Sequence, residues 1–313
     1  MTSKHVDTAI RDGASAMCWG AWSELGVSGW GRTHQSWGID PEPLIIFTAA
    51  IGDRDPRLRN EALDWCIRNV RNVSQIRLRN ILRMQSDATK QAWGQFAATV
   101  SEQSGIQWPG STEPMDFATT GKSILRSFIE PSMVLLRMRA IFGMGARTEV
   151  IRSLMFGVEH RATAAMLAET TNYAKRNVAN ACDSLAQAGM LATVDISNRF
   201  YYALAQPYAA AEFIGNLPAF VPNWNLLLRF VGTLLSYSDL AENQPDELRI
   251  VLAHTAWLEV EKDLVGLGIA GPPVTESPGF LESWNSWIKG LMDSLATGTW
   301  PGNDSLSTKW LIL

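Results

Sequence analysis

Along most of the chain, apolar residues recur at the three- and four-residue spacing of helices that bury one face. Only one stretch departs clearly from that spacing. Residues 190–196 and 199–204 combine β-branched and aromatic side chains around a polar tip, which predicts a β-hairpin. We therefore expect a mainly α protein. The predicted helices cover residues 6–25, 43–51, 55–70, 74–84, 87–103, 131–143, 147–157, 223–237, 245–267 and 280–295.

A change in composition predicts three domains in the 313 residues. Residues 105–120 are rich in Gly, Pro, Ser and Thr, which favours a linker at the end of a helical N-terminal domain, 1–120. The central domain, 121–206, contains the predicted hairpin. Residues 207–313 form a helical C-terminal domain with five Lys or Arg against twelve Asp or Glu. The thirteen tryptophans are expected to anchor cores or interfaces.

The central domain contains the most informative segment, which predicts a short helix, a tight turn and a longer helix over about 174–188. Thr163 is suited to cap the short helix, and Asn172 to the left-handed backbone of the turn. Gly189 suits the end of the longer helix. One face of that longer helix is expected to be buried, and it carries Val178, Ala181, Cys182 and Leu185.

The opposite face of the longer helix carries side chains of the types that contact DNA. Arginine pairs with guanine, asparagine with adenine, and lysine with phosphate. The candidate DNA-binding residues are Lys175, Arg176, Asn177, Asn180 and Ser184, with Asn198 and Arg199 added at the hairpin tip.

This segment resembles the winged helix-turn-helix transcription regulators of MarR and ArsR type. The matching residues are 167–169, Asn172, Lys175, Val178, Leu185, 188–191 and 199–204, within about residues 147–204. The resemblance implies a winged helix whose second helix and hairpin bind double-stranded DNA. It does not extend to the N- and C-terminal domains.

The expected function is therefore that of a DNA-binding transcription regulator, with repression as the commoner mode. A homodimer is expected, because one winged helix contacts too little DNA to select an operator. The amphipathic helix 280–295 is a candidate dimer seam, and a core helix is the alternative. The rival function is a protein-interaction adaptor, such as an antitoxin-like or defence-associated partner of an enzyme. It would bind a protein partner through the winged helix, the Trp-rich N-terminal domain or the acidic C-terminal domain.

The charge distribution suggests a second basic surface, although the net charge is −4. Residues 54–83 contain eight arginines and three carboxylates. Phosphate contact is one interpretation of this stretch, and ion pairing with the acidic C-terminal domain is the other. The candidate residues are Arg68, Arg71, Arg77, Arg79 and Arg83.

Nothing in the sequence points to an enzyme, a metal site or a cofactor. The three cysteines are far apart and lie in apolar patterns, so we expect buried thiols in a reducing compartment. Residues 1–12 do not resemble a signal peptide, and the longest apolar stretches are too short to span a bilayer. The expected location is the cytoplasm.

Overall fold

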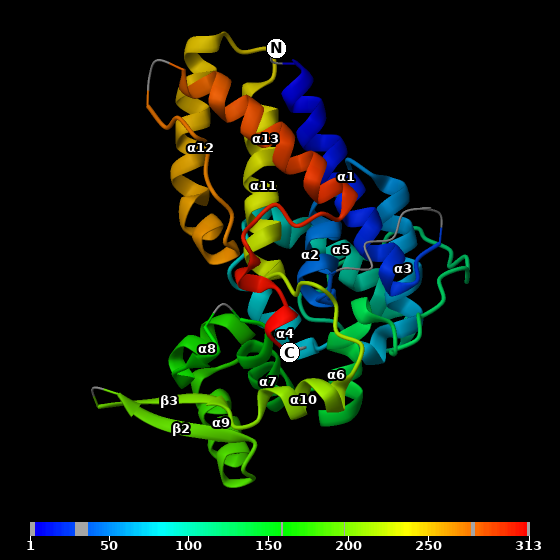
Figure 1. Ribbon diagram of the computed structural model, residues 1–313. Helices are drawn as coiled ribbons and strands as arrows, with labels where there is room; N and C mark the ends of the chain where they lie inside the picture. Colours follow the sequence, from blue (N-terminus) through cyan, green and yellow to red (C-terminus); the bar gives the residue numbers. More distant parts are fainter. Residues whose placement is uncertain (1–3, 29–36, 158, 197, 277–278, 312–313) are drawn as a thin grey trace.

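The computed structural model, which describes residues 4–28, 37–157, 159–196, 198–276 and 279–311, is mainly helical, as predicted (Figure 1). The α-helices are α1 (Lys4–Leu25), α2 (Pro41–Ala50), α3 (Pro56–Asn69), α4 (Gln75–Leu82), α5 (Asp87–Ser104), α6 (Val134–Phe142), α7 (Ala146–Phe156), α8 (Ala164–Thr171), α9 (Lys175–Gln187), α10 (Pro207–Ile214), α11 (Trp224–Ala241), α12 (Asp246–Leu267) and α13 (Phe280–Thr297). The strands are β1 (Arg161–Ala162), β2 (Leu191–Ile196) and β3 (Arg199–Leu204).

A first hydrophobic core is built jointly by the N-terminal helices α1–α5 and the C-terminal helices α11–α13. Helix α13 packs along α1, and α11 packs against α1, α2 and α12 (Figure 1). The two segments that were predicted as separate domains therefore share one core. The apolar face of α13 is part of it, since Trp284 and Ile288 are completely buried. This burial makes α13 a core helix and overturns its prediction as a dimer seam.

Tryptophan rings hold the predicted linker against the first core. Trp108 is buried and stacks on Trp93 of α5, with 5.5 Å between the ring centroids. The Trp108 amide donates to Ser101 Oγ at 2.8 Å, and the Met115 amide donates to Thr99 Oγ1 at 2.9 Å. Residues 105–120 are consequently packed along α5 before the chain continues to the second core.

A second hydrophobic core contains α6–α10, the strands and Leu311 from the end of the chain. The strands form an antiparallel sheet in the order β1-β3-β2. In the hairpin, Val194 lies opposite Tyr201, and Ile196 opposite Arg199. The hairpin was predicted almost to the residue. Strand β1 was missed because two residues are too few to show an alternating pattern.

The local signals of the central segment are confirmed. Thr163 Oγ1 accepts the Met166 amide at 3.3 Å and caps α8. Asn172 has φ 59° at the end of α8, and Gly189 has φ +74° after α9. Asn172 turns the chain between α8 and α9, and Gly189 turns it between α9 and β2. The two left-handed residues therefore set how α9 is oriented against its neighbours in the second core.

A cluster of buried ion pairs joins the two cores. Arg77 of α4 donates to both carboxylate oxygens of Asp40 at 2.6 Å and also binds Glu42. Arg139 of α6 binds Glu42 at 2.8 Å and Glu149 of α7 at 3.1 Å. Burial alone would raise the pKa values of Asp40 and Glu149, but the surrounding arginines outweigh it and hold both pKa values below their ordinary range.

Candidate nucleic-acid interface

Helix α9 divides sharply into a buried and an exposed face. Its apolar residues are buried, with exposed fractions of 0% for Val178 and Cys182, 5% for Ala181 and 8% for Leu185. The candidate DNA-binding residues Lys175, Arg176, Asn177 and Asn180 are all exposed. The structure therefore exposes all four side chains in the amino-terminal half of one helix.

Ser184, the fifth candidate on α9, is half-buried, and its hydroxyl oxygen accepts a hydrogen bond from Arg147 Nη2 at 3.2 Å. Arg147 lies in the first turn of α7, is exposed, and adds a cation beside the C-terminal half of α9. Arg147 is not among the residues predicted for the site, because no local pattern relates positions 37 residues apart.

A hydrogen bond ties the hairpin to α9. The Tyr202 hydroxyl in β3 donates to Asp183 Oδ1 at 3.0 Å, and burial together with this carboxylate raises the pKa of Tyr202 to about 12. Burial also raises the pKa of the Cys182 thiol to about 12, so it remains protonated at neutral pH. Cys18, Cys66 and Cys182 are buried and free, as expected. Cys182 thus packs on the buried face of α9, in a position unsuited to nucleophilic chemistry.

The tip of the hairpin carries two of the predicted residues. Asn198 is exposed with φ 62°, and Arg199 begins β3 with an exposed side chain. Phe200 follows and is 65% exposed. It was not predicted as part of the site, because alternation along β3 places it on the same face as Tyr202, which is buried.

The five arginines of the predicted second basic surface differ in exposure. Arg68, Arg71, Arg79 and Arg83 are exposed, whereas Arg77 is completely buried among carboxylates. The prediction that Arg77 belongs to a surface is wrong. Its partners Asp40 and Glu42 precede it by 37 and 35 residues, so its burial could not be deduced from the charge run.

Ion pairing with the acidic C-terminal segment was the other interpretation of residues 54–83. It is observed for Arg54, which is not one of the five candidate arginines. Arg54 forms an ion pair with Asp239 of α11, which links the N-terminal segment to the acidic C-terminal one. Arg68 instead donates to the carbonyl of Gly121 at 2.6 Å. The exposed arginines of this stretch therefore have different surroundings.

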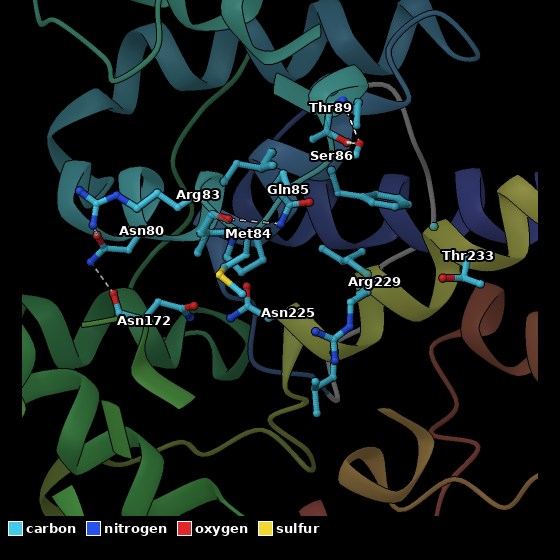
Figure 2. A pocket seen from close by; sticks show the side chains of 18 of the residues that line it. Asn80, Arg83, Met84, Gln85, Ser86, Thr89, Asn172, Asn225, Arg229 and Thr233 are labelled. Atoms are coloured by element: carbon cyan, nitrogen blue, oxygen red, sulfur yellow. Dashed lines mark hydrogen bonds between the residues drawn. The ribbon is translucent and has the colours of Figure 1, made fainter. Parts of the chain in front are cut away.

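A cleft of about 990 Å³ adjoins the start of α9. Its walls come from α2, from α11, from the connection between α4 and α5, and from the turn between α8 and α9. Figure 2 shows Asn80 and Arg83 beside Asn172 on one side, with Asn225 and Arg229 of α11 across the cleft. Arg83 thus lines the same hollow as the residues that lead into α9.

Two hydrogen bonds fasten the α8–α9 turn to α4. Asn80 Nδ2 donates to the Asn172 carbonyl at 2.8 Å, and the hydroxyls of Ser74 and Tyr173 lie 3.2 Å apart. Tyr173 is buried, and burial raises its pKa. These contacts fasten the turn that leads into α9 to α4, beside the cleft that Arg83 also lines.

The described residues contain no group of three or more His, Cys, Asp and Glu placed to hold a metal ion. None of the helices in the described part combines the length and apolar character needed to cross a bilayer. Comparison of the chain with protein-family models, curated proteins and solved structures finds no match.

Proposed function

We propose that residues 147–204 form a winged helix-turn-helix and that the protein binds double-stranded DNA through α9. The observation that carries this proposal is the division of α9 into an apolar face, buried to within 8% exposure, and a face that displays Lys175, Arg176, Asn177 and Asn180. Cations at the amino end of a helix oppose its dipole, whereas together with the two amides they match the side-chain types that contact phosphates and base edges.

The positions of the residues on α9 and the hairpin suit some of them to base contact and others to phosphate contact. Arg176 and Asn180 are four residues apart and lie one turn from each other, so in a major groove they would reach neighbouring base pairs. Lys175 would contact phosphate on one side, and Arg199 of the hairpin would contact it on the other. Ala174 precedes α9 without a side-chain cap, which leaves the first backbone amides of the helix available to a phosphate.

Arg83 supplies a contact from outside the winged helix. It is exposed and lines the cleft that Ala174 and Asn172 also line. DNA lying over the start of α9 would bring a phosphate into its reach. Arg68 is exposed on α3, is held by Gly121 and takes no part in lining that cleft, so it lies outside the proposed DNA footprint.

The regulatory role follows from DNA binding. A single winged helix reads only a few base pairs, so selection of an operator calls for two copies of the chain. Repression would result where the bound dimer covers a promoter. Because the apolar face of α13 is buried in the first core, the two copies would meet through another surface.

Selection of DNA fragments from a random duplex library, followed by titration at several salt concentrations, tests the proposal. Three phosphate contacts per chain, from Lys175, Arg199 and Arg83, predict a slope of log affinity against log salt of about −3 for each bound chain. Arg83→Glu should make the slope shallower by about 1 or more, whereas Arg68→Glu should leave it unchanged. The absence of selected fragments, or an affinity independent of salt, would contradict DNA binding.

A second candidate function, that of a protein-interaction adaptor, is favoured by a different observation. Helix α12 exposes a row of large apolar side chains far from α9 in the sequence. That surface could serve a regulator and an adaptor alike.

A further inference from the structure

Helix α12 buries only one of its two apolar faces. The inner face packs on α11 and contains Ala253, Ala256, Val260, Leu264 and Leu267. The outer face exposes Leu248 (42%), Val251 (58%), Leu258 (70%) and Val265 (76%). In Figure 1 this helix lies at the margin of the molecule, beyond α11 and α13. A surface helix normally presents polar residues outward, so this row needs an explanation.

The spacing of the exposed row is that of a coiled-coil seam. Val251, Leu258 and Val265 follow one another at intervals of seven residues, and Leu248 precedes the first of them by three. Thr255 and Lys262 fill the remaining positions of the same alternating three-four pattern, and both are exposed. From Leu248 to Val265 the row extends for about 26 Å, at about 1.5 Å per residue. We define Leu248, Val251, Leu258 and Val265 as the α12 seam.

Acidic residues border the α12 seam on both sides. Glu247 and Glu261 lie along one edge, Glu259 lies along the other, and all three are exposed. The basic Arg249 is buried and paired with Asp7 at 3.0 Å, so it does not offset this charge. Lys262 is the exposed cation on the helix, and it lies within the row itself.

The same charges disfavour a second copy of the chain as the occupant. In an antiparallel pair of α12 helices that aligns the two rows over their full length, Val251 of one copy would face Lys262 of the other. In a parallel pair, Lys262 would face itself. Both directions bring like charges together or place an ammonium group against an apolar residue, which opposes pairing.

We propose that the α12 seam is the docking site for an amphipathic helix of a partner protein. That helix would carry apolar residues at the 3.5-residue repeat, Lys or Arg along both edges, and an acidic residue opposite Lys262. Apolar contact supplies affinity, and the opposite charges at the edges set partner choice. This inference does not depend on DNA binding by α9.

Fluorescence anisotropy with two synthetic three-heptad peptides tests the proposal on the full chain. Both peptides carry Leu at the seam positions and Glu opposite Lys262; one has Lys at the edge positions and the other has Glu. The basic peptide should bind the wild-type protein, and Leu258→Glu should weaken that binding at least tenfold. Ile129→Glu is the matched control, because Ile129 is 67% exposed, lies outside α12 and outside the cleft, and should leave binding unchanged.

Each result decides for or against the proposal. Equal binding of the acidic and the basic peptide, or unchanged binding by Leu258→Glu, would overturn it. Light scattering on the free chain checks the other occupant: conversion of a wild-type dimer to a monomer by Leu258→Glu would show that a second copy covers the seam. An unchanged oligomeric state and unchanged DNA affinity in that variant, with lost peptide binding, support a separate docking site.

Discussion

Replacement of Arg77 by methionine should be among the most destabilising single changes in the chain. Arg77 supplies both hydrogen bonds to the Asp40 carboxylate at 2.6 Å and a further one to Glu42. Without it, Glu42 keeps Arg139 at 2.8 Å, but the nearest arginine nitrogen to Asp40 is that of Arg139 at 4.0 Å. Asp40 is 2% exposed, so its charge would be left almost without compensation. Loss of one partner from a buried pair costs about 3–5 kcal/mol.

Urea unfolding followed by tryptophan fluorescence measures this cost. Arg79→Met is the matched control, since Arg79 lies exposed on the same helix and should change the unfolding free energy by no more than about 0.5 kcal/mol. Adding Asp40→Asn to Arg77→Met should restore part of the loss, because the orphaned charge is removed. Equal effects of Arg77→Met and Arg79→Met would refute the assignment of Arg77 to a buried cluster.

Two further predictions concern the second core and the ion-pair cluster. Val178→Asp should lower the unfolding free energy by at least ~3 kcal/mol, because it buries a charge. Arg176→Ala should change it by no more than about 0.5 kcal/mol, because Arg176 is exposed. Similar losses for the two variants in urea unfolding would mean that the buried and exposed faces of α9 are assigned wrongly. The pKa values of Asp40 and Glu149 are lowered in the folded protein, so the stability they contribute is present above their unfolded pKa values and is lost as the pH falls. The unfolding free energy should therefore drop below about pH 4, and Asp40→Asn should make that drop shallower; identical pH profiles would contradict the role of the cluster.

The features that the sequence predicted correctly are local ones. The cap at Thr163, the left-handed Asn172 and Gly189, and the buried row on α9 each depend on residues within one or two helical turns. The exposed cations and amides of α9 followed from the same periodicity. Helical spacing therefore sufficed to predict the arrangement of side chains on the candidate DNA-binding helix.

Long-range packing is what the sequence did not reveal. The amphipathic pattern of α13 shows that one face is buried, but it does not show whether α1 or a second chain covers it. Arg77 belongs to the same run of arginines as Arg79 and Arg83. Its partners are Asp40 and Glu42 at the start of α2, which are distant in the chain, so the run of charges does not show that Arg77 is buried. The cleft at the amino end of α9 likewise arises from segments that are distant in the chain.

The most direct test of DNA recognition by α9 compares two alanine variants on two duplexes. After a preferred site has been selected, the affinities of wild type, Asn180→Ala and Lys175→Ala are measured on that site and on a scrambled one. Asn180→Ala should cost about 1–3 kcal/mol on the preferred site and much less on the scrambled one, because base contacts specify the sequence. Lys175→Ala should weaken binding to both by similar amounts, because phosphate contacts do not. Unchanged binding of both variants to both duplexes would contradict the assignment of α9 as the recognition helix.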